Sequence, residues 1–160
     1  MSAPSSTHGL SERLTLMSND PAFRTPLSDS NSRVPPHNVD AEASLLGAML
    51  LSRDAIGPAV ETLDGDQFYV PAHGYIFDAI ASLYGAGEPA DPVTVAEELT
   101  RSGLLEQIGG PQRLLELQTA TPASSNAARY AQIVEEHALL RRLIGVAGDI
   151  VELGLSLIHI

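Results

Sequence analysis

The sequence predicts an all-α fold, in which a small helical globule is followed by one long helix. Three observations predict it. Apolar residues recur at spacings of three and four from residue 34 onward, Gly and Pro separate these segments, and no segment shows the sustained alternation of a strand. With 160 residues, 44% of them hydrophobic, the chain is long enough for one domain with a buried core.

Three helices are expected in the first part of the globule. The first has Asn38 or Asp40 as its N-cap, and the second follows a cap at Ser52. Because Pro58 lies inside the second segment, we expect that helix to be kinked or to start late. The third begins near Pro71. The side chains that we expect to form the core are Leu46, Leu50, Ile76, Phe77, Ile80 and Leu83.

Two further helices complete the globule. Thr94 and Glu97 have the spacing of a capping box, so we expect a helix to begin at Thr94 and to end at Gly103. The next helix starts with Pro111 at its first position, and Thr121-Pro122 closes it.

The last and longest helix is expected after a cap within Ser124–Asn126 and runs to about Leu153, a length of roughly 40 Å. Its apolar positions repeat at alternating spacings of three and four, which is typical of a coiled-coil seam. That seam is Tyr130, Ile133, His137, Leu140, Ile144, Ala147 and Val151. A second apolar column, which includes Ile150, lies beside it, and Ala138 is expected on the far side.

The two columns together are wider than one partner helix covers. We therefore expect this helix to contact a further helix or another chain, and the alternative is that it docks only on the chain's own core. His137 is the polar member of the seam. We interpret it as a residue that sets the register, with a pH-sensitive contact as the alternative.

Composition excludes several chemistries. All nine basic residues are Arg, so neither a P-loop nor a Schiff-base lysine is present, and the absence of Cys excludes disulfides and thiolate metal sites. The net charge of −11 argues against independent tight DNA binding. The five His lack metal-ligand spacing and no catalytic pattern is found, so we expect no catalytic, cofactor or metal residues. No segment is apolar enough for a membrane span or a signal peptide, and we expect a cytoplasmic protein.

The chain divides into four parts by composition. Residues 1–33 are rich in Ser, Thr and Pro and are expected to form a disordered leader. Residues 34–123 form the globular domain, 124–154 the long helix, and 155–160 a tail discussed below.

Several short motifs occur in an order that resembles the amino-terminal domain of replicative DnaB-type DNA helicases. The similarity covers about 34–154 and rests on the following segments: Val34–Asn38, Glu42–Gly47, Phe68–His73 with Ile76-Phe77, Thr94–Ala96, Gly109-Gly110, Thr121-Pro122 with Asn126, and Tyr130–Val134. The tail 155–160 does not resemble the family. We interpret it as non-native read-through, with a natural truncation as the alternative.

The resemblance implies a role in DNA replication. In this family a helical hairpin follows the globule, hairpins pair two subunits, and three pairs form the collar of a hexamer. The long helix would be the first half of that hairpin. Motor domains that use ATP and Mg²⁺ would lie beyond this chain, so the fragment itself is expected to be no enzyme. Primase docks at the hairpin, where Ile144 and Ile150 are the candidate contacts and Arg113 is expected on the same side. The alternative is a stand-alone helical adaptor or oligomerisation module without a motor partner.

Overall fold

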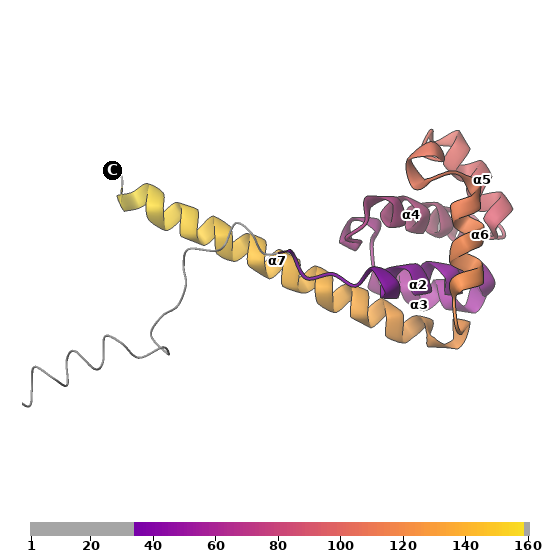
Figure 1. Cartoon of the computed structure of the whole chain (residues 1–160), viewed down its shortest axis with the longest axis horizontal. Helices are drawn as coiled ribbons and strands as arrows, with labels where there is room; N and C mark the ends of the chain where they lie inside the picture. The colour runs from indigo at the N-terminus through magenta and orange to yellow at the C-terminus, as the bar shows by residue number, and fades with distance from the viewer. Residues whose placement is uncertain (1–33, 159–160) are drawn as a thin grey trace, which may run out of the picture. The chain divides into compact units, whose positions relative to one another are not determined.

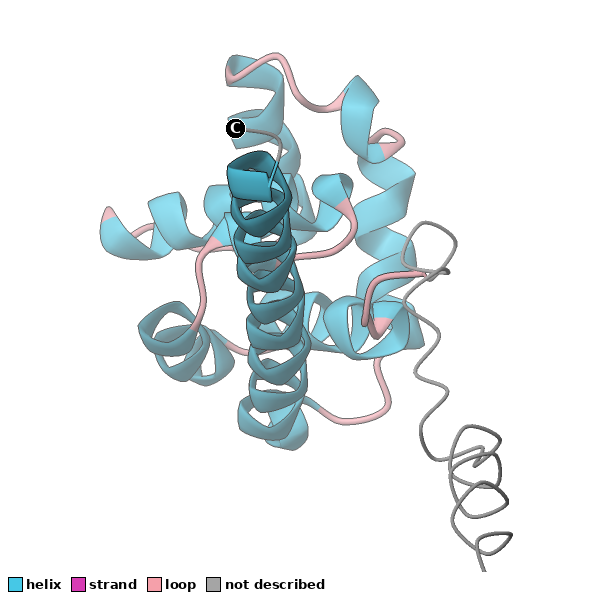
Figure 2. Cartoon of the chain, turned by 90° about the vertical axis from the view of Figure 1, so that its left-hand side faces the viewer, coloured by secondary structure: helices cyan, strands magenta, loops and turns pink. Residues whose placement is uncertain are grey.

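The structure is a computed structural model that describes residues 34–158, and every regular element within that range is helical (Figures 1 and 2). The predicted all-α class is confirmed. The expected leader, 1–33, and the last two residues of the expected tail lie outside the described residues. The elements in order are α2 (Val39–Leu51), α3 (Arg53–Thr62), η2 (Gly65–Gln67), α4 (Pro71–Gly85), α5 (Pro92–Arg101), η3 (Glu106–Ile108), α6 (Pro111–Ala120), η4 (Ser124–Asn126) and α7 (Ala127–Ile158), where η marks a short 3₁₀ helix.

Helix α2 is the centre of the globule. It packs against α3, α4, α6 and α7, and eight of its 13 residues are buried. The predicted core is confirmed, since all six side chains named above are buried, with exposed fractions between 0% and 6%. Burial of these apolar side chains supplies the main driving force for the fold.

One glycine permits the closest approach in this core. A Cβ on Gly47 would lie far inside van der Waals distance of the Leu117 carbonyl and the Thr121 hydroxyl, so only glycine lets α2 meet the end of α6. That end is itself fixed, because the Thr121 hydroxyl donates to the Leu117 carbonyl at 2.8 Å.

Two helix starts refine the predictions. Asn38 is the N-cap of α2, and its Oδ1 accepts from the Ala41 N–H at 2.9 Å. The start predicted at Thr94 is wrong, because α5 begins at Pro92. Asp91 is its cap and accepts from the Val93 and Thr94 N–H groups, while the Thr94 hydroxyl accepts from the Asp91 N–H. Thr94 therefore belongs to a capping box as the third residue of the helix and not as its cap.

Two expectations about helix length also differ from the structure. Helix α3 does not start late, because it begins at Arg53 and continues through Pro58. Pro58 lacks the N–H that would donate within this helix, so a kink there stays a prediction. Helix α7 continues past the predicted end near Leu153 to Ile158, since no proline interrupts the apolar sequence there.

Candidate assembly and docking interface

Helix α7 has one half that packs on the globule and one half that does not. The packed half buries a column of small side chains at spacings of four and three, namely Ala127, Ala131, Val134 and Ala138. The prediction that Ala138 faces away is therefore wrong. Small residues form this column because α2 and α3 lie directly against it, and larger side chains would keep the helices apart.

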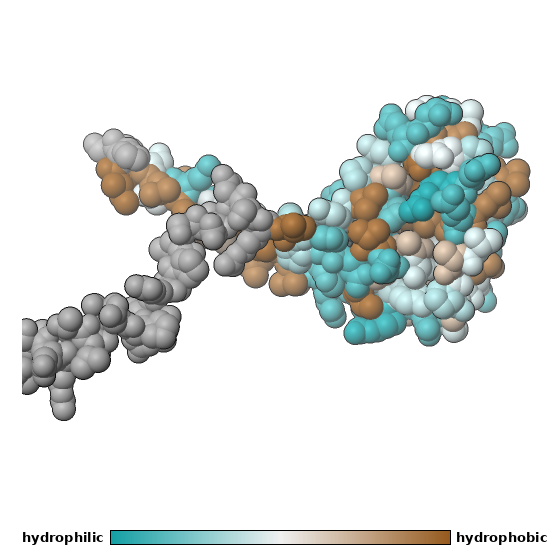
Figure 3. Space-filling view, in the orientation of Figure 1, coloured by the Kyte–Doolittle hydropathy of each residue, from teal (hydrophilic) through white to brown (hydrophobic). Residues whose placement is uncertain are grey.

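The other half projects from the globule (Figure 1), and we call residues 142–158 the arm. Every residue of the arm is exposed in the chain by itself. Figure 3 shows brown, hydrophobic side chains along this projection. The large ones are Leu143, Ile144, Val146, Ile150, Val151, Leu153, Leu155, Leu157 and Ile158, each at least 53% exposed. A contiguous apolar surface of this extent is typical of a helix that packs against a further helix or subunit.

The predicted contact residues fall into two groups. Tyr130, Ile133 and His137 flank the buried column and are half-buried against the globule. The remaining seam positions are exposed, as are both candidate isoleucines, at 58% for Ile144 and 63% for Ile150. The structure thus leaves the second group fully accessible to a partner and the first group partly accessible, and the contact role of both stays a prediction.

His137 uses its ring within its own helix. Its Nδ1 donates to the Ile133 carbonyl at 2.7 Å, since that oxygen can only accept. The carbonyl lies one turn earlier, so the ring orientation is set locally. This contact leaves Nε2 as the ring atom for a partner.

Arg113 lies on α6 and is the exposed end of a buried polar network. One guanidinium nitrogen lies 3.3 Å from the Glu116 carboxylate, and the other faces His73 Nε2 at 3.4 Å. His73, only 1% exposed, donates from Nδ1 to Glu42 at 2.8 Å. Because a guanidinium can only donate, this network assigns the neutral His73 tautomer that carries its proton on Nδ1.

Glu42 joins this network to the start of α4. Its carboxylate accepts from the Tyr69 N–H at 2.6 Å and from the Val70 N–H at 3.3 Å, and Val70 is the N-cap of α4. A carboxylate at this place satisfies backbone donors that the helix leaves free and interacts favourably with its dipole. Glu42 and His73 lie in separate sequence motifs, and no sequence signal predicted their pairing.

A second residue that the sequence analysis missed is Arg141, at the point where α7 leaves the globule. Its guanidinium donates to the Pro36 carbonyl at 2.9 Å and to the Gln67 carbonyl at 2.5 Å. It also lies over the Tyr69 ring, 5.7 Å from the ring centre. Arg141 thereby ties three segments of the chain to one another.

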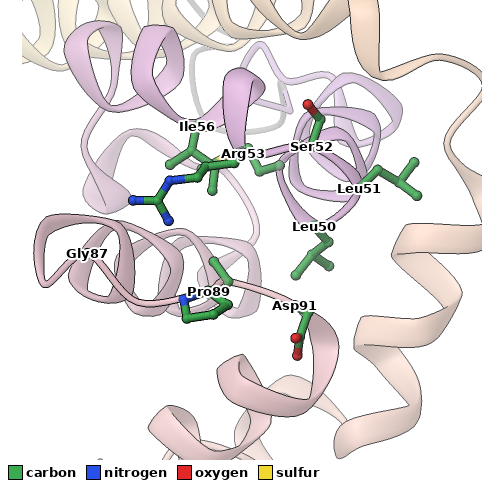
Figure 4. Close-up of a pocket in the computed structure, with 10 residues that line it drawn as sticks. Leu50, Leu51, Ser52, Arg53, Ile56, Gly87, Pro89 and Asp91 are labelled. Atoms are coloured by element: carbon green, nitrogen blue, oxygen red, sulfur yellow. The ribbon is translucent and has the colours of Figure 1, made fainter.

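The globule also has a small cleft between α2, α3 and the loop before α5, with a volume of about 270 Å³ (Figure 4). Arg53, the one cationic side chain that lines the cleft, already binds other groups of the globule. The guanidinium donates to the Glu88 carbonyl at 3.0 Å and lies over the Tyr84 ring. These contacts hold the wall of the cleft together, and we assign Arg53 a structural role.

Asp78 is exposed as a residue, but partial desolvation of its carboxyl raises its pKa above the usual value, and the Gly65 backbone hydrogen bond opposes this effect. The charges of Asp64 and Asp66 raise that pKa further.

Across residues 34–158, no group of three or more His, Cys, Asp or Glu side chains is arranged to hold a metal ion. Within the same range, none of the helices has the length and apolar composition needed to cross a bilayer.

The fold and the arm define a helical domain from which a long helix with exposed apolar side chains projects. The sequence model described as "DnaB-like helicase N terminal domain" matches residues 34–136, well over half of the chain. The chain belongs to this family, and the resemblance drawn from its motifs is confirmed.

Relatives and solved structures agree with this assignment. The replicative DNA helicase DnaB of Mycobacterium leprae is 51% identical over 129 residues, and that of Leifsonia xyli is 48% identical over 125. These stretches cover 81% and 78% of this chain but only 21% and 27% of the relatives. The chain therefore spans about a quarter of the length of these helicases.

Two solved structures share the fold. The N-terminal domain of the Mycobacterium tuberculosis DnaB helicase superposes with a TM-score of 0.74 at 52% identity, covering 76% of this chain and 88% of that one. The corresponding Helicobacter pylori domain, described together with its interactions with primase, has a TM-score of 0.63 at 23% identity. It covers 72% of this chain and 89% of its own.

Proposed function

We propose that this chain is the amino-terminal assembly and primase-docking domain of a hexameric replicative DNA helicase. Two observations support the proposal. The chain belongs to the family of helicase N-terminal domains, and the apolar side chains of its arm are exposed and available for packing against further protein. In the complete protein these domains would form the collar of the ring. ATP and Mg²⁺ would serve motor domains outside this chain.

Self-association is the first consequence to test. Sedimentation velocity over a range of protein concentrations should show a concentration-dependent shift from monomer to dimer or larger species. Ile150→Glu should abolish the shift, because it places a charge on the apolar face of the arm. Val93→Glu is the matched control, since Val93 is 76% exposed and lies on α5. A purely monomeric protein at high concentration would contradict the assembly role of this chain.

Primase docking is the second consequence, and it is supported by the primase interaction described for the Helicobacter pylori domain. Ile144→Ala and Ile150→Ala, introduced together into the longer helicase, test whether the arm contacts primase directly. Loss of primase binding by an intact hexamer supports direct docking. If the hexamer dissociates and primase affinity falls only in proportion, the two isoleucines act in assembly alone.

The division of the chain belongs to the same proposal. We assign 34–123 to the globule and 124–154 to the long helix, and we treat 155–160 as foreign to the domain. Replacing or deleting 155–160 should leave the thermal unfolding of the globule unchanged, because the described residues of this segment are exposed.

A further inference from the structure

The globule makes its last polar contact with α7 through Arg141. This residue continues the spacing of the buried column, three positions after Ala138, and it is half-buried whereas every later described residue of α7 is exposed. Packing on α2 and α3 holds α7 up to Ala138, and Arg141 is the last contact with the globule before the exposed arm.

The contacts of Arg141 come from segments far away in the sequence. The Pro36 carbonyl is 105 positions away and the Gln67 carbonyl is 74 positions away. Each is a backbone oxygen, so the two hydrogen bonds fix the backbone of the lead-in segment before α2 and the end of η2 against α7. A planar guanidinium can reach two acceptors in this way, whereas a lysine ammonium lacks the fork.

An aromatic stack completes the arrangement. The Tyr69 ring lies under the Arg141 guanidinium, and the His37 ring stacks on Tyr69 with ring centres 4.2 Å apart and an angle of 14° between the planes. His37 Nδ1 in turn donates to the Pro35 carbonyl at 2.7 Å. Cation–π contact and stacking both add attraction that depends on orientation.

The core network holds Tyr69, whose ring lies under the Arg141 guanidinium, in place. The backbone N–H of Tyr69 donates to Glu42, whose carboxylate is 2% exposed and also binds the buried His73. The ring of Tyr69 thus projects from a backbone that the core network holds in place. Arg141 therefore joins α7 to a part of the globule that the core network holds in place.

We propose that Arg141 is a positioning residue, and that its clamp on Pro36, Gln67 and Tyr69 fixes the direction in which the arm leaves the globule. Glu152 on the arm lies about 17 Å along the helix axis from Arg141. A change of about 10° at the clamp would displace it by about 3 Å, enough to misalign packed helices. The use of this direction in assembly rests on the function proposed above, but the direction itself does not.

The test measures the direction without any partner. The chain has no Cys, so Glu61→Cys on α3 and Glu152→Cys on the arm provide two unique sites for spin labels, and both positions are exposed. Pulsed electron–electron double resonance measures the width of the distribution of distances between the two labels. Excess unlabelled protein is added so that pairs of labels on different molecules do not contribute. We expect Arg141→Ala to widen this distribution, while Arg142→Ala, a neighbour of the same charge on the exposed face, leaves it unchanged.

Two further variants separate positioning from a general loss of structure. Tyr69→Phe keeps the ring and should match the parent, whereas Tyr69→Ala should widen the distribution as Arg141→Ala does. These variants also carry the test if Arg141→Ala fails to fold. Far-UV circular dichroism must show unchanged helix content in the widened variants.

Parent-like widths for Arg141→Ala or for Tyr69→Ala would overturn the proposal. Widening with a matching loss of helix would overturn it too, because it would show fraying of α7 in place of a change in direction. If the distance distributions change as expected but the chain never self-associates, only the proposed assembly function is refuted.

Discussion

Replacing Glu42 by alanine should destabilise the globule more than any other single removal of a charge. The carboxylate is 2% exposed and accepts hydrogen bonds from the Tyr69 N–H, the Val70 N–H and His73 Nδ1. Removing it leaves three donors without their acceptor at a buried position. Each such donor costs about 1–3 kcal/mol, although water entering the vacated space offsets part of the sum.

The net loss is expected to be about 3–5 kcal/mol, because three buried donors lose their acceptor and entering water offsets only part of that cost. A domain of this size has a stability of about 5–15 kcal/mol, so the loss removes a large fraction of it and partly unfolds the variant if the parent lies at the low end of that range. Urea unfolding followed by circular dichroism at 222 nm measures the change. Glu61→Ala is the matched control, because this residue is an exposed glutamate on α3, and it should change stability by less than about 0.5 kcal/mol.

A double-mutant cycle identifies the pairing itself. His73→Ala and Glu42→Ala should together cost less than the sum of the single losses, because both remove the same hydrogen bond. Additive losses, or a Glu42→Ala loss below about 1 kcal/mol, would refute the reasoning that this network holds the start of α4.

Three other changes test the core, the close packing of α2 and the charge of Asp78. Phe77→Ala removes a ring that is 2% exposed and should cost about 3–5 kcal/mol, and an unchanged melting temperature would show that Phe77 packs loosely. Gly47→Ala forces a methyl group against the end of α6 and should cost about 1–3 kcal/mol or more in urea unfolding; a parent-like midpoint would mean that the helices separate freely. Asp78→Asn should raise the melting temperature at pH 7, because partial desolvation raises the pKa of Asp78 and its charged form is disfavoured in the folded state. With a raised folded-state pKa, protonated Asp78 stabilises the fold fully below the unfolded-state value of 3.8, and this stability is lost as the pH rises through the raised pKa. The advantage of Asn over Asp78 should therefore shrink on acidification. An advantage that does not change between pH 7 and pH 4 would contradict this origin.

The helices and the core were predictable because their signals are local. Leu46 and Ile80 were assigned to the core from apolar spacing alone, and both are fully buried. The start of α5 was misplaced by two residues, because Thr94 and Glu97 also have capping-box spacing. Asp91 followed by a proline was the better signal, since proline favours the first position of a helix.

The packed face of α7 was misread for a different reason. Spacings of three and four fit two columns that are offset by one residue, one with Ile133 and Leu140 and one with Val134 and Ala138. The sequence analysis chose the larger side chains. The structure buries the smaller ones, because α2 lies so close to α7 that only alanine and valine fit between them. Periodicity defines the candidate faces of a helix, but the distance to its neighbour decides which face is buried.

Contacts between distant segments were outside the reach of sequence reasoning. Glu42 and His73 are 31 positions apart, and each looks like an ordinary polar residue in an apolar segment. Arg141 and its two carbonyl partners are farther apart still, and backbone oxygens carry no sequence signal at all. The resemblance of the motifs to a family marked Glu42 and His73, but it gave no reason why these residues occur.

The core network and the root of the arm form one continuous chain of contacts, and this continuity makes a last prediction. Glu42 fixes the backbone of Tyr69, and the Tyr69 ring supports Arg141. Glu42→Gln keeps the side-chain volume and one acceptor oxygen, so the globule should stay folded with a moderate loss of about 1–3 kcal/mol. The Tyr69 platform should nevertheless loosen, and the spin-label distance between Glu61→Cys and Glu152→Cys should broaden in this variant. If Glu42→Gln lowers stability and leaves the distance distribution unchanged, the network supports α4 alone and the orientation of the arm is set independently of it.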